Sequence, residues 1–275
     1  MAELAHLPFP VLDALPCGAH RLVMLTDQAL YEACGVRVAF AGRDGGVSTG
    51  PYASLNTGDN TDDDPNAVEH NRQLVCQAFD AGQAPMISPR QVHGIQFVDI
   101  DDEAEAKQVA HRARQGADGV VVRTGGVSAL MNSADCLCFA VVSPTGSFAL
   151  AHAGWRGAIE HIAAKAVQEL ESCDAAPASE YNAYLGPHIR TGCFEVSYEL
   201  AQRFRDEFGD GALSDARHVS LAASVTADLV SAGLLIERIV DSRICTQCNS
   251  DRYFSYRATQ GMCGRHATFA YREPR

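Results

Sequence analysis

The sequence predicts a single-domain α/β protein in which helices cover one mixed sheet. Apolar segments of strand length alternate along the chain with amphipathic segments of helix length, as in layered α/β folds. Four short apolar runs follow one another in the centre, separated by turn residues, and this dense spacing favours mixed over purely parallel pairing. Hydrophobic residues make up 47% of the 275 residues and charged residues 20%, which suits a globular protein with a real core.

The N-terminal part divides into an irregular segment and the start of the domain. Residues 1–35 are expected to be irregular because three prolines, at positions 8, 10 and 16, lie close together. One catalytic α/β domain is expected over residues 36–275. Residues 36–41 alternate as a short strand, and a glycine-rich loop follows over residues 42–52.

Helix-start residues and periodic apolar positions define the remaining elements. Asp64 as N-cap and Pro65 in the first turn predict a helix that ends near residue 79. The clearest helix is expected over 159–170, where apolar residues recur at steps of three and four. The other strands are expected at 119–123, 128–132, 137–142, 147–151, 181–185 and 236–240, and the other helices at 197–208 and 221–233.

Charge and cysteine usage narrow the functional class. The net charge is −12, from 22 basic and 34 acidic residues, so no basic surplus is available for general nucleic-acid binding. No stretch approaches 18 consecutive apolar residues, and the first residues lack a secretory pattern, so we expect no membrane span and a cytoplasmic protein. Its ten cysteines are then expected to be reduced thiols. We expect a monomer or a weak homodimer.

Three potential metal ligands stand where apolar segments meet glycine-containing loops: His93, Cys136 and His152. Two imidazoles and a thiolate suit Zn²⁺, and a fourth position left to water would make the site catalytic. The alternative is that both histidines are hydrogen-bonded core residues and the cysteine is a packing residue. The glycines beside both histidines and Asp135 beside the thiol favour a site.

Two glycine-rich segments are candidates for anion binding. The turn Gly154 to Gly157 is expected to lie at a helix N-terminus, where backbone amides favour an anion, and Arg156 supplies a guanidinium there. The loop over residues 42–52 carries Arg43 and Ser48 among four glycines, which permits close approach of the backbone to a ligand. Arg43, Ser48 and Arg156 are therefore predicted to bind substrate or phosphate.

A second possible zinc site lies near the C-terminus. Its four candidate ligands form a Cys-x2-Cys pair followed, after fourteen residues, by a Cys-x2-His pair: Cys245, Cys248, Cys263 and His266. Against this interpretation, residues 254–257, between the pairs, resemble a strand of a known family rather than a finger loop.

Seven strings together resemble a known family. They lie at residues 43–56, 91–94, 117–119, 134–136, 152–157, 185–189 and 254–257. In this order the chain resembles the polyphenol oxidase or multicopper laccase-domain family, which includes peptidoglycan editing and purine nucleoside phosphorylase-like proteins. The resemblance spans roughly residues 36–272.

The resemblance implies an α/β/α fold like that of a cysteine-hydrolase toxin domain. It implies phosphorolysis of adenosine, inosine, guanosine or methylthioadenosine, together with adenosine deamination. The family's metal and catalytic trio falls on His93, Cys136 and His152, and its arginine that meets the nucleoside or phosphate falls on Arg43.

Three other functions stay open from the sequence. Cys136 and His152 suit a cysteine hydrolase or amidase that acts on cell-wall precursors. A copper-dependent phenol oxidase is less expected, because ten histidines include no His-x-His pair and Cu²⁺ oxidases use many histidines. A non-enzymatic binding protein braced by zinc is the third. The leading expectation is a zinc enzyme that uses a purine nucleoside and phosphate.

Overall fold

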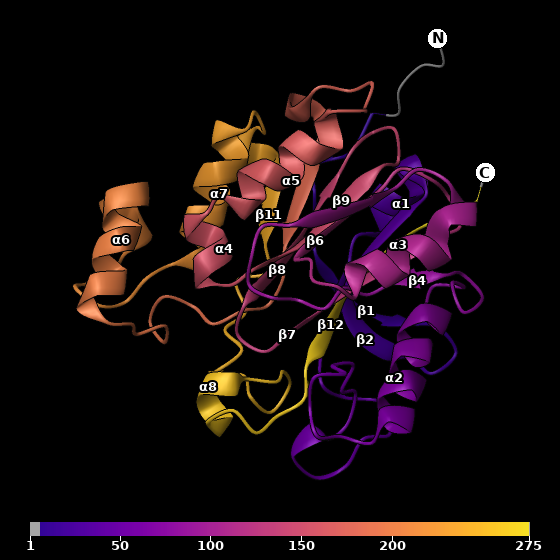
Figure 1. Ribbon diagram of the computed structural model, residues 1–275, viewed down its shortest axis with the longest axis horizontal. Helices are drawn as coiled ribbons and strands as arrows, with labels where there is room; N and C mark the ends of the chain where they lie inside the picture. Colours follow the sequence, from indigo (N-terminus) through magenta and orange to yellow (C-terminus); the bar gives the residue numbers. More distant parts are fainter. Residues whose placement is uncertain (1–5, 275) are drawn as a thin grey trace.

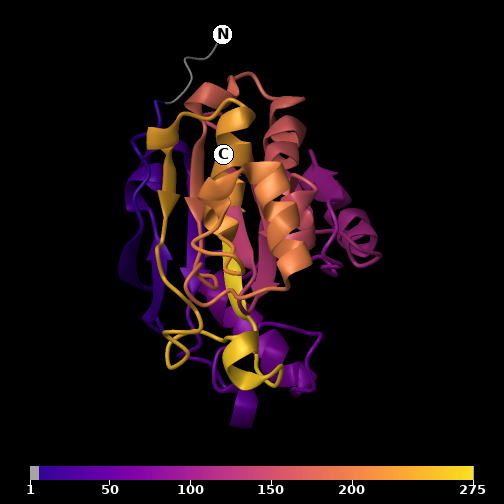
Figure 2. The same cartoon turned by 90° about the vertical axis from the view of Figure 1, so that its left-hand side faces the viewer.

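Two six-stranded sheets pack face to face in this computed structural model, which describes residues 6–274 (Figures 1 and 2). The N-terminal sheet has the strand order β1-β2-β3-β12-β7-β4, and the central sheet has the order β11-β10-β8-β9-β6-β5. One apolar cluster contains buried residues of both sheets, such as Phe40 from the first and Leu150 from the second, and forms the core between them. Each sheet is mixed, with both parallel and antiparallel neighbours.

Strand bounds follow the apolar runs. The N-terminal sheet comprises β1 (Asp13–Cys17), β2 (Leu22–Thr26), β3 (Val36–Ala41), β4 (Met86–Ile87), β7 (Ser128–Ser133) and β12 (His266–Arg272). The central sheet comprises β5 (Phe97–Ile100), β6 (Gly119–Val122), β8 (Leu137–Val142), β9 (Phe148–Ala153), β10 (Asn182–Leu185) and β11 (Ile239–Asp241). Every residue of β6, β8 and β9 is buried because both faces of the central sheet are covered, which explains why these strands are continuously apolar.

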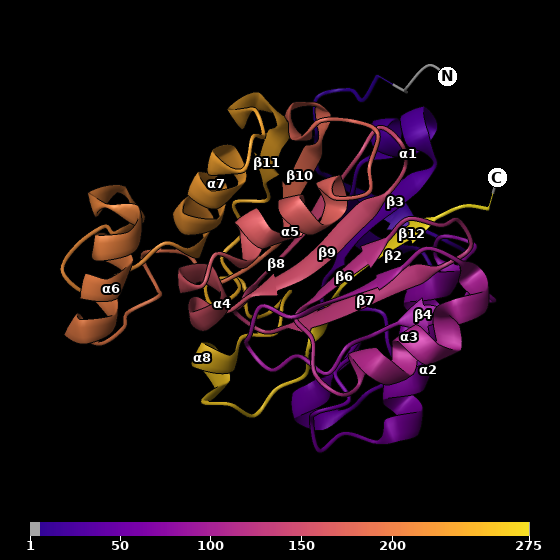
Figure 3. The ribbon, with the colours of Figure 1, turned by 45° about the horizontal axis from the view of Figure 1, so that its top comes forward.

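Helices cover the two outer faces. Figure 3 shows α5 and α7 across the central sheet, and α2 packs on the N-terminal sheet. The helix α3 lies at the side, in contact with β4 and β5. The α-helices are α1 (Gln28–Cys34), α2 (Pro65–Gln77), α3 (Ala106–Ala113), α4 (Trp155–Ile159), α5 (Ile162–Glu171), α6 (Tyr198–Phe208), α7 (Leu221–Ser231) and α8 (Tyr256–Thr259). The short 3-10 helices are η1 (Gly50–Tyr52), η2 (Glu103–Glu105), η3 (Ala178–Glu180), η4 (Asp210–Ala212) and η5 (Ile236–Arg238).

The α/β class is confirmed, and the structure corrects the prediction in three places. The expectation of irregular structure up to residue 35 is wrong, because β1, β2 and α1 lie there and bury residues such as Met24 and Leu30. The single expected sheet is two sheets, since β7 joins β12 while its neighbours in sequence join the central sheet. The helix expected over 159–170 begins earlier, and it divides into α4 and α5 at His161, whose φ is 59°.

Within the part of the chain that the structure describes, no helix combines the length and the apolar character needed to cross a membrane.

Candidate active site

His93, Cys136 and His152 converge at one end of the central sheet. Their potential ligand atoms lie within 4.8 Å of one another. The Sγ atom of Cys136 lies 3.9 Å from Nε2 of His93, and the two imidazole rings meet edge to face at 4.9 Å between centroids. His152 is buried, Cys136 is partly buried and His93 is exposed, so the cluster opens to solvent on one side.

Strand register explains how two of the three meet. The antiparallel pair β8 and β9 places Leu137 opposite Ala153, so Cys136, one residue earlier, comes beside the end of β9. An ideal Cβ on Gly154 would lie 3.4 Å from Sγ of Cys136 and only 2.7 Å from the ring of His93. Glycine at position 154 is therefore required for the three side chains to come this close.

Asp118 fixes both histidines. Its Oδ1 atom lies 2.9 Å from Nδ1 of His152, which leaves Nε2 of His152 as the ring nitrogen available to the cluster. The same carboxylate accepts backbone N–H bonds from Val92, His93 and Gly94 at 3.1, 3.0 and 2.8 Å. These bonds hold the loop in which His93 adopts a left-handed φ of 60°. Asp118 is fully buried and lies directly before β6.

The three side chains fit a zinc ion. Zn–S and Zn–N bonds of about 2.0–2.3 Å in tetrahedral geometry place ligand atoms about 3.3–3.8 Å apart, close to the 3.9 Å between Cys136 and His93. The pairing of His152 with Asp118 is the carboxylate–histidine arrangement that orients zinc-binding imidazoles. The donor set therefore suits zinc, with one position open towards solvent.

The electrostatics of the cluster favour a thiolate. Burial raises the pKa of Cys136, but the charge of His152 and hydrogen bonds from both histidines outweigh it and lower that pKa to about 6. Burial lowers the pKa of His152, whereas the thiolate of Cys136 and the hydrogen bond to Asp118 raise it to about 9. In the metal-free protein both shifts favour a thiolate on Cys136 paired with an imidazolium on His152.

The cluster lies in a cavity of about 570 Å³. Besides the three side chains, its lining includes aromatic and basic residues: Trp155, Arg156, Phe194, Tyr256, Arg257 and Arg265. A cavity of this size with aromatic faces and guanidinium groups suits a small aromatic ligand, a small anion, or an aromatic ligand bound together with phosphate.

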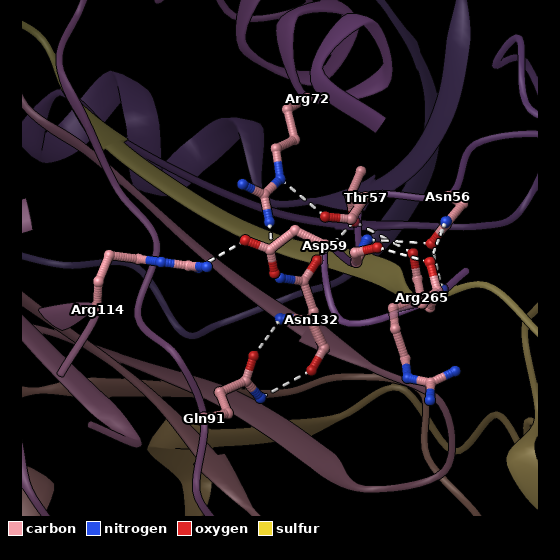
Figure 4. Close-up of polar contacts among 10 residues, drawn as sticks. Asn56, Thr57, Asp59, Arg72, Gln91, Arg114, Asn132 and Arg265 are labelled. Atoms are coloured by element: carbon pink, nitrogen blue, oxygen red, sulfur yellow. Dashed lines mark hydrogen bonds and ion pairs between the residues drawn. The ribbon is translucent and has the colours of Figure 1, made fainter. Parts of the chain in front are cut away.

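A polar network contributes to the cavity wall (Figure 4). Asp59 forms ion pairs with Arg114 at 2.6 Å and with Arg72 at 3.4 Å. Gln91 and Asn132 exchange two hydrogen bonds of 2.8 and 2.9 Å between side chain and backbone. Asp59, Gln91 and Asn132 all line the cavity, so these contacts fix its shape.

The structure does not bring Arg43 or Ser48 into this cavity. The guanidinium of Arg43 donates to the backbone oxygens of Ala53 and Ser250 and covers the ring of Phe254. Ser48 is buried and accepts a hydrogen bond from Asn71. Neither lines the cavity, so we correct the expectation that they hold phosphate: both fix the glycine-rich loop instead.

Arg156 does line the cavity, with its guanidinium carbon 4.4 Å from the ring centroid of Trp155. The predicted helix N-terminus at Gly154 belongs to α4, which has only five residues. A helix this short has a weak macrodipole, so the guanidinium of Arg156 is the stronger anion-binding feature of this turn.

The second predicted zinc site is not assembled from its four expected ligands. His266 is buried in β12, where Nε2 meets Oγ of Ser133 at 3.0 Å, and Cys263 contacts the guanidinium of Arg265. Cys245 and Cys248 lie instead with Cys193. The spacing of the ligands was misleading because β12 carries His266 into the sheet.

Sequence reasoning missed several residues of the site. Asp118 belonged to a string that was noted without a role, although an acidic residue directly before a fully apolar strand was the available indication. Arg257 and Arg265 reach the cavity from the C-terminal region, more than 100 residues from Cys136. Arg257 belongs to the string at residues 254–257, but neither the string nor the surroundings of Arg265 show that these side chains reach the cavity, because that depends on the fold.

Comparisons with known proteins identify the relatives of this chain. The family described as "Multi-copper polyphenol oxidoreductase laccase" matches residues 37–273. Adenosine deaminase RL5, from an unknown prokaryotic organism, is 32% identical over 232 residues, which cover 81% of this chain and 88% of the relative. The purine nucleoside phosphorylase YfiH of Escherichia coli K12 is 32% identical over 246 residues, which cover 86% of this chain and 94% of the relative.

A solved structure has the same fold. The crystal structure of YlmD from Geobacillus stearothermophilus superposes with a TM-score of 0.83 at 26% identity, covering 95% of this chain and 99% of that one. This chain therefore shares its overall fold with that protein.

Proposed function

We propose that the chain, which belongs to the multi-copper polyphenol oxidoreductase laccase family, is a zinc-dependent purine nucleoside phosphorylase that also deaminates adenosine. The observation that carries the proposal is the convergence of His93, Cys136 and His152 in a cavity lined by aromatic and basic side chains. Relatives at 32% identity are named for these two activities. The substrates proposed are adenosine, inosine, guanosine and methylthioadenosine, with phosphate.

In this proposal the aromatic residues of the cavity bind the purine and the basic residues bind phosphate. The faces of Trp155, Phe194 and Tyr256 offer stacking surface for a purine. Arg156, Arg257 and Arg265 offer positive charge for phosphate. In phosphorolysis, a phosphate oxygen bonds to the ribose C1′ atom while the C1′–N9 bond breaks, and the purine takes a proton as it leaves. The arginines position the attacking phosphate and stabilise its charge.

His93, Cys136 and His152 are the residues proposed to hold the metal. Zinc bound there supplies a Lewis acid that makes a water molecule nucleophilic near neutral pH. In deamination, water adds at the purine C6 atom and ammonia leaves, so adenosine gives inosine. His152 is oriented for this site by its contact with the carboxylate of Asp118.

Product analysis tests the proposal directly. Zinc-loaded protein incubated with inosine and phosphate is expected to release hypoxanthine and ribose 1-phosphate, and with adenosine alone to release inosine and ammonia. Cys136→Ser is expected to lower both rates at least about 100-fold, since a ligand of the reacting site is lost. Cys173→Ser, which changes an exposed thiol outside the cavity, is the control. Folded, zinc-loaded protein with no more product than Cys136→Ser would refute the proposal.

A cysteine hydrolase is the second candidate, favoured by one observation. The lowered pKa of Cys136 and the raised pKa of His152 give the thiolate–imidazolium pair of a cysteine nucleophile. An acyl adduct on Cys136, detected by mass spectrometry after metal-free protein meets an amide or ester of a cell-wall precursor, would support it. Multicopper oxidation is not proposed, because the cavity lining contains only two histidines among the described residues.

A further inference from the structure

Three thiols form a second cluster of soft ligands that the proposed reaction does not use. The sulfur atoms of Cys193, Cys245 and Cys248 lie within 4.8 Å of one another, and those of Cys193 and Cys248 are 3.4 Å apart. Cys245 is buried, Cys193 is partly buried and Cys248 is exposed, so the cluster opens to solvent on one side.

Hydrogen bonds close the turn from Cys245 to Cys248 and bring two backbone N–H groups to the Sγ atom of Cys245. Asn249 donates its backbone N–H and its side-chain amide to the carbonyl oxygen of Cys245, at 3.1 and 2.8 Å, which closes the turn. The Sγ atom of Cys245 accepts a backbone N–H from Arg190 at 3.5 Å, and the backbone of Cys248 also donates to it. Backbone N–H groups that point at a sulfur stabilise the thiolate form that a metal requires.

A short parallel pairing brings the third thiol to this turn. His188 and Cys245 form a β-bridge, and the N–H of Thr246 donates to the carbonyl oxygen of His188 at 3.1 Å. From Arg190 the chain then turns back, with the N–H of Cys193 bonded to the carbonyl oxygen of Arg190 at 2.8 Å. Two segments more than 50 residues apart are thus held together with their thiols adjacent.

We propose that Cys193, Cys245 and Cys248 bind one zinc ion, separately from the candidate active site, with water as the fourth ligand. Thiolates around tetrahedral zinc lie about 3.8 Å apart, which small side-chain rotations reach from the present positions. A disulfide would use only two of the three thiols. When the ion binds, each thiol releases its proton to solvent and forms one Zn–S bond, so up to three protons leave.

The thiol cluster adjoins the cavity wall. Phe194, the residue after Cys193, lines the cavity. Arg257, which also lines it, donates to the carbonyl oxygens of Cys193 and Glu195 at 3.3 and 3.0 Å. An ion that joins residue 193 to the turn at 245–248 therefore fixes this wall. The proposal itself does not depend on the reaction that the cavity performs.

Zinc content separates this site from the first one. In a Cys136→Ser background, the thiol cluster is expected to retain about one zinc per chain after dialysis. Adding Cys193→Ser, Cys245→Ser or Cys248→Ser is expected to remove it, whereas adding Cys263→Ser or Cys173→Ser leaves it in place. Replacement by Co²⁺ is expected to give a sulfur-to-cobalt charge-transfer band that only the first three substitutions abolish. Circular dichroism confirms that each variant is folded.

A second measurement needs no substitution in the cluster. Zinc added to reduced Cys136→Ser protein is expected to protect Cys193 and Cys248 from iodoacetamide at least about tenfold, measured by peptide mass spectrometry. The proposal is overturned if zinc gives no protection, if Cys136→Ser holds no zinc, or if Cys263→Ser removes it. A Cys193–Cys248 disulfide that persists in protein purified without oxygen would also overturn it.

Discussion

At the scale of single residues, Asp118 contributes most to the geometry of the site. One buried carboxylate accepts three backbone N–H bonds from residues 92–94 and contacts Nδ1 of His152. Burial raises its pKa, but the hydrogen bond and charge of His152 and the backbone donors outweigh this and lower it. It therefore stays ionised while it orients the imidazole of His152 and holds the backbone of His93.

Asp118→Asn is expected to weaken zinc binding about 10–100-fold. This is the loss usual in metalloproteins when a residue that hydrogen-bonds to a metal-binding histidine is replaced. The amide cannot accept all four contacts and has no charge to favour the correct ring tautomer of His152. Competition with a chelating dye measures the affinity. Asp13→Asn, an exposed position of β1, is the matched control, and an affinity equal to that of the control would contradict this role.

At the scale of elements, the β8–β9 pairing and the turn after it determine whether the ligands can meet. Leu137 opposite Ala153 aligns Cys136 with Gly154, where a side chain would collide with His93. The same turn leads into α4, and α5 begins after the left-handed residue His161.

Gly154→Ala is expected to reduce bound zinc while the protein stays folded. The added Cβ would lie 2.7 Å from Cδ2 of His93, which is exposed and is displaced more easily than the buried sheet. Overpacking of this kind costs about 1–3 kcal/mol. Zinc per chain is measured beside circular dichroism. Gly211→Ala serves as control because nothing lies within 4 Å of its ideal Cβ, and equal zinc content in both variants would refute the expectation.

His161 predicts a pH dependence of stability. Its Nδ1 contacts Asp228 of α7 at 2.7 Å and its Nε2 contacts Glu207 of α6 at 2.9 Å. The hydrogen bond to Asp228 and the nearby acids raise the pKa of His161 despite partial desolvation. The folded state therefore favours the protonated form of His161. The stability that this charge contributes is complete below the pKa of histidine in the unfolded chain, about 6.5, and is lost as the pH rises through the raised pKa of the folded state.

The melting temperature of His161→Asn is therefore expected to fall further below that of the parent at pH 6 than at pH 9. Asparagine tolerates the left-handed backbone, so the comparison isolates the charge. Thermal denaturation followed by circular dichroism at both pH values measures the difference. His111→Asn, an exposed position of α3, is the control. If the difference in melting temperature between the parent and His161→Asn were larger at pH 9 than at pH 6, the expectation would be wrong.

At the scale of the whole molecule, the two sheets share one core and are expected to unfold together. Phe40 of β3 is 1% exposed and lies against Gly186, the residue after β10 of the other sheet. Phe40→Ala is expected to cost about 3–5 kcal/mol of unfolding free energy because it leaves a cavity between the sheets.

Urea denaturation followed by fluorescence and by circular dichroism tests this expectation. Both probes are expected to give one coincident transition with a lowered midpoint. Phe9→Ala, where the side chain is 66% exposed, is expected to change little. Two separated transitions in the parent protein would show that the sheets are independent.

By itself the sequence determined the chemistry that the chain can offer and much of its local structure. Residue type specified two imidazoles near glycines and a thiol beside Asp135. Apolar periodicity predicted strands such as β3 and β8 and helices such as α6. The spacing of apolar residues shows which face of a helix or strand is buried. This can be inferred without knowing which other element packs against that face.

Only the tertiary structure decided which strands pair and which charges reach the cavity. Periodicity could not show that β7 leaves its neighbours for the N-terminal sheet, because a buried strand looks the same in either sheet. Nor could it show that Arg43 binds backbone carbonyls while Arg257 and Arg265 line the cavity. These outcomes depend on contacts between residues far apart in sequence, and no local pattern encodes such contacts.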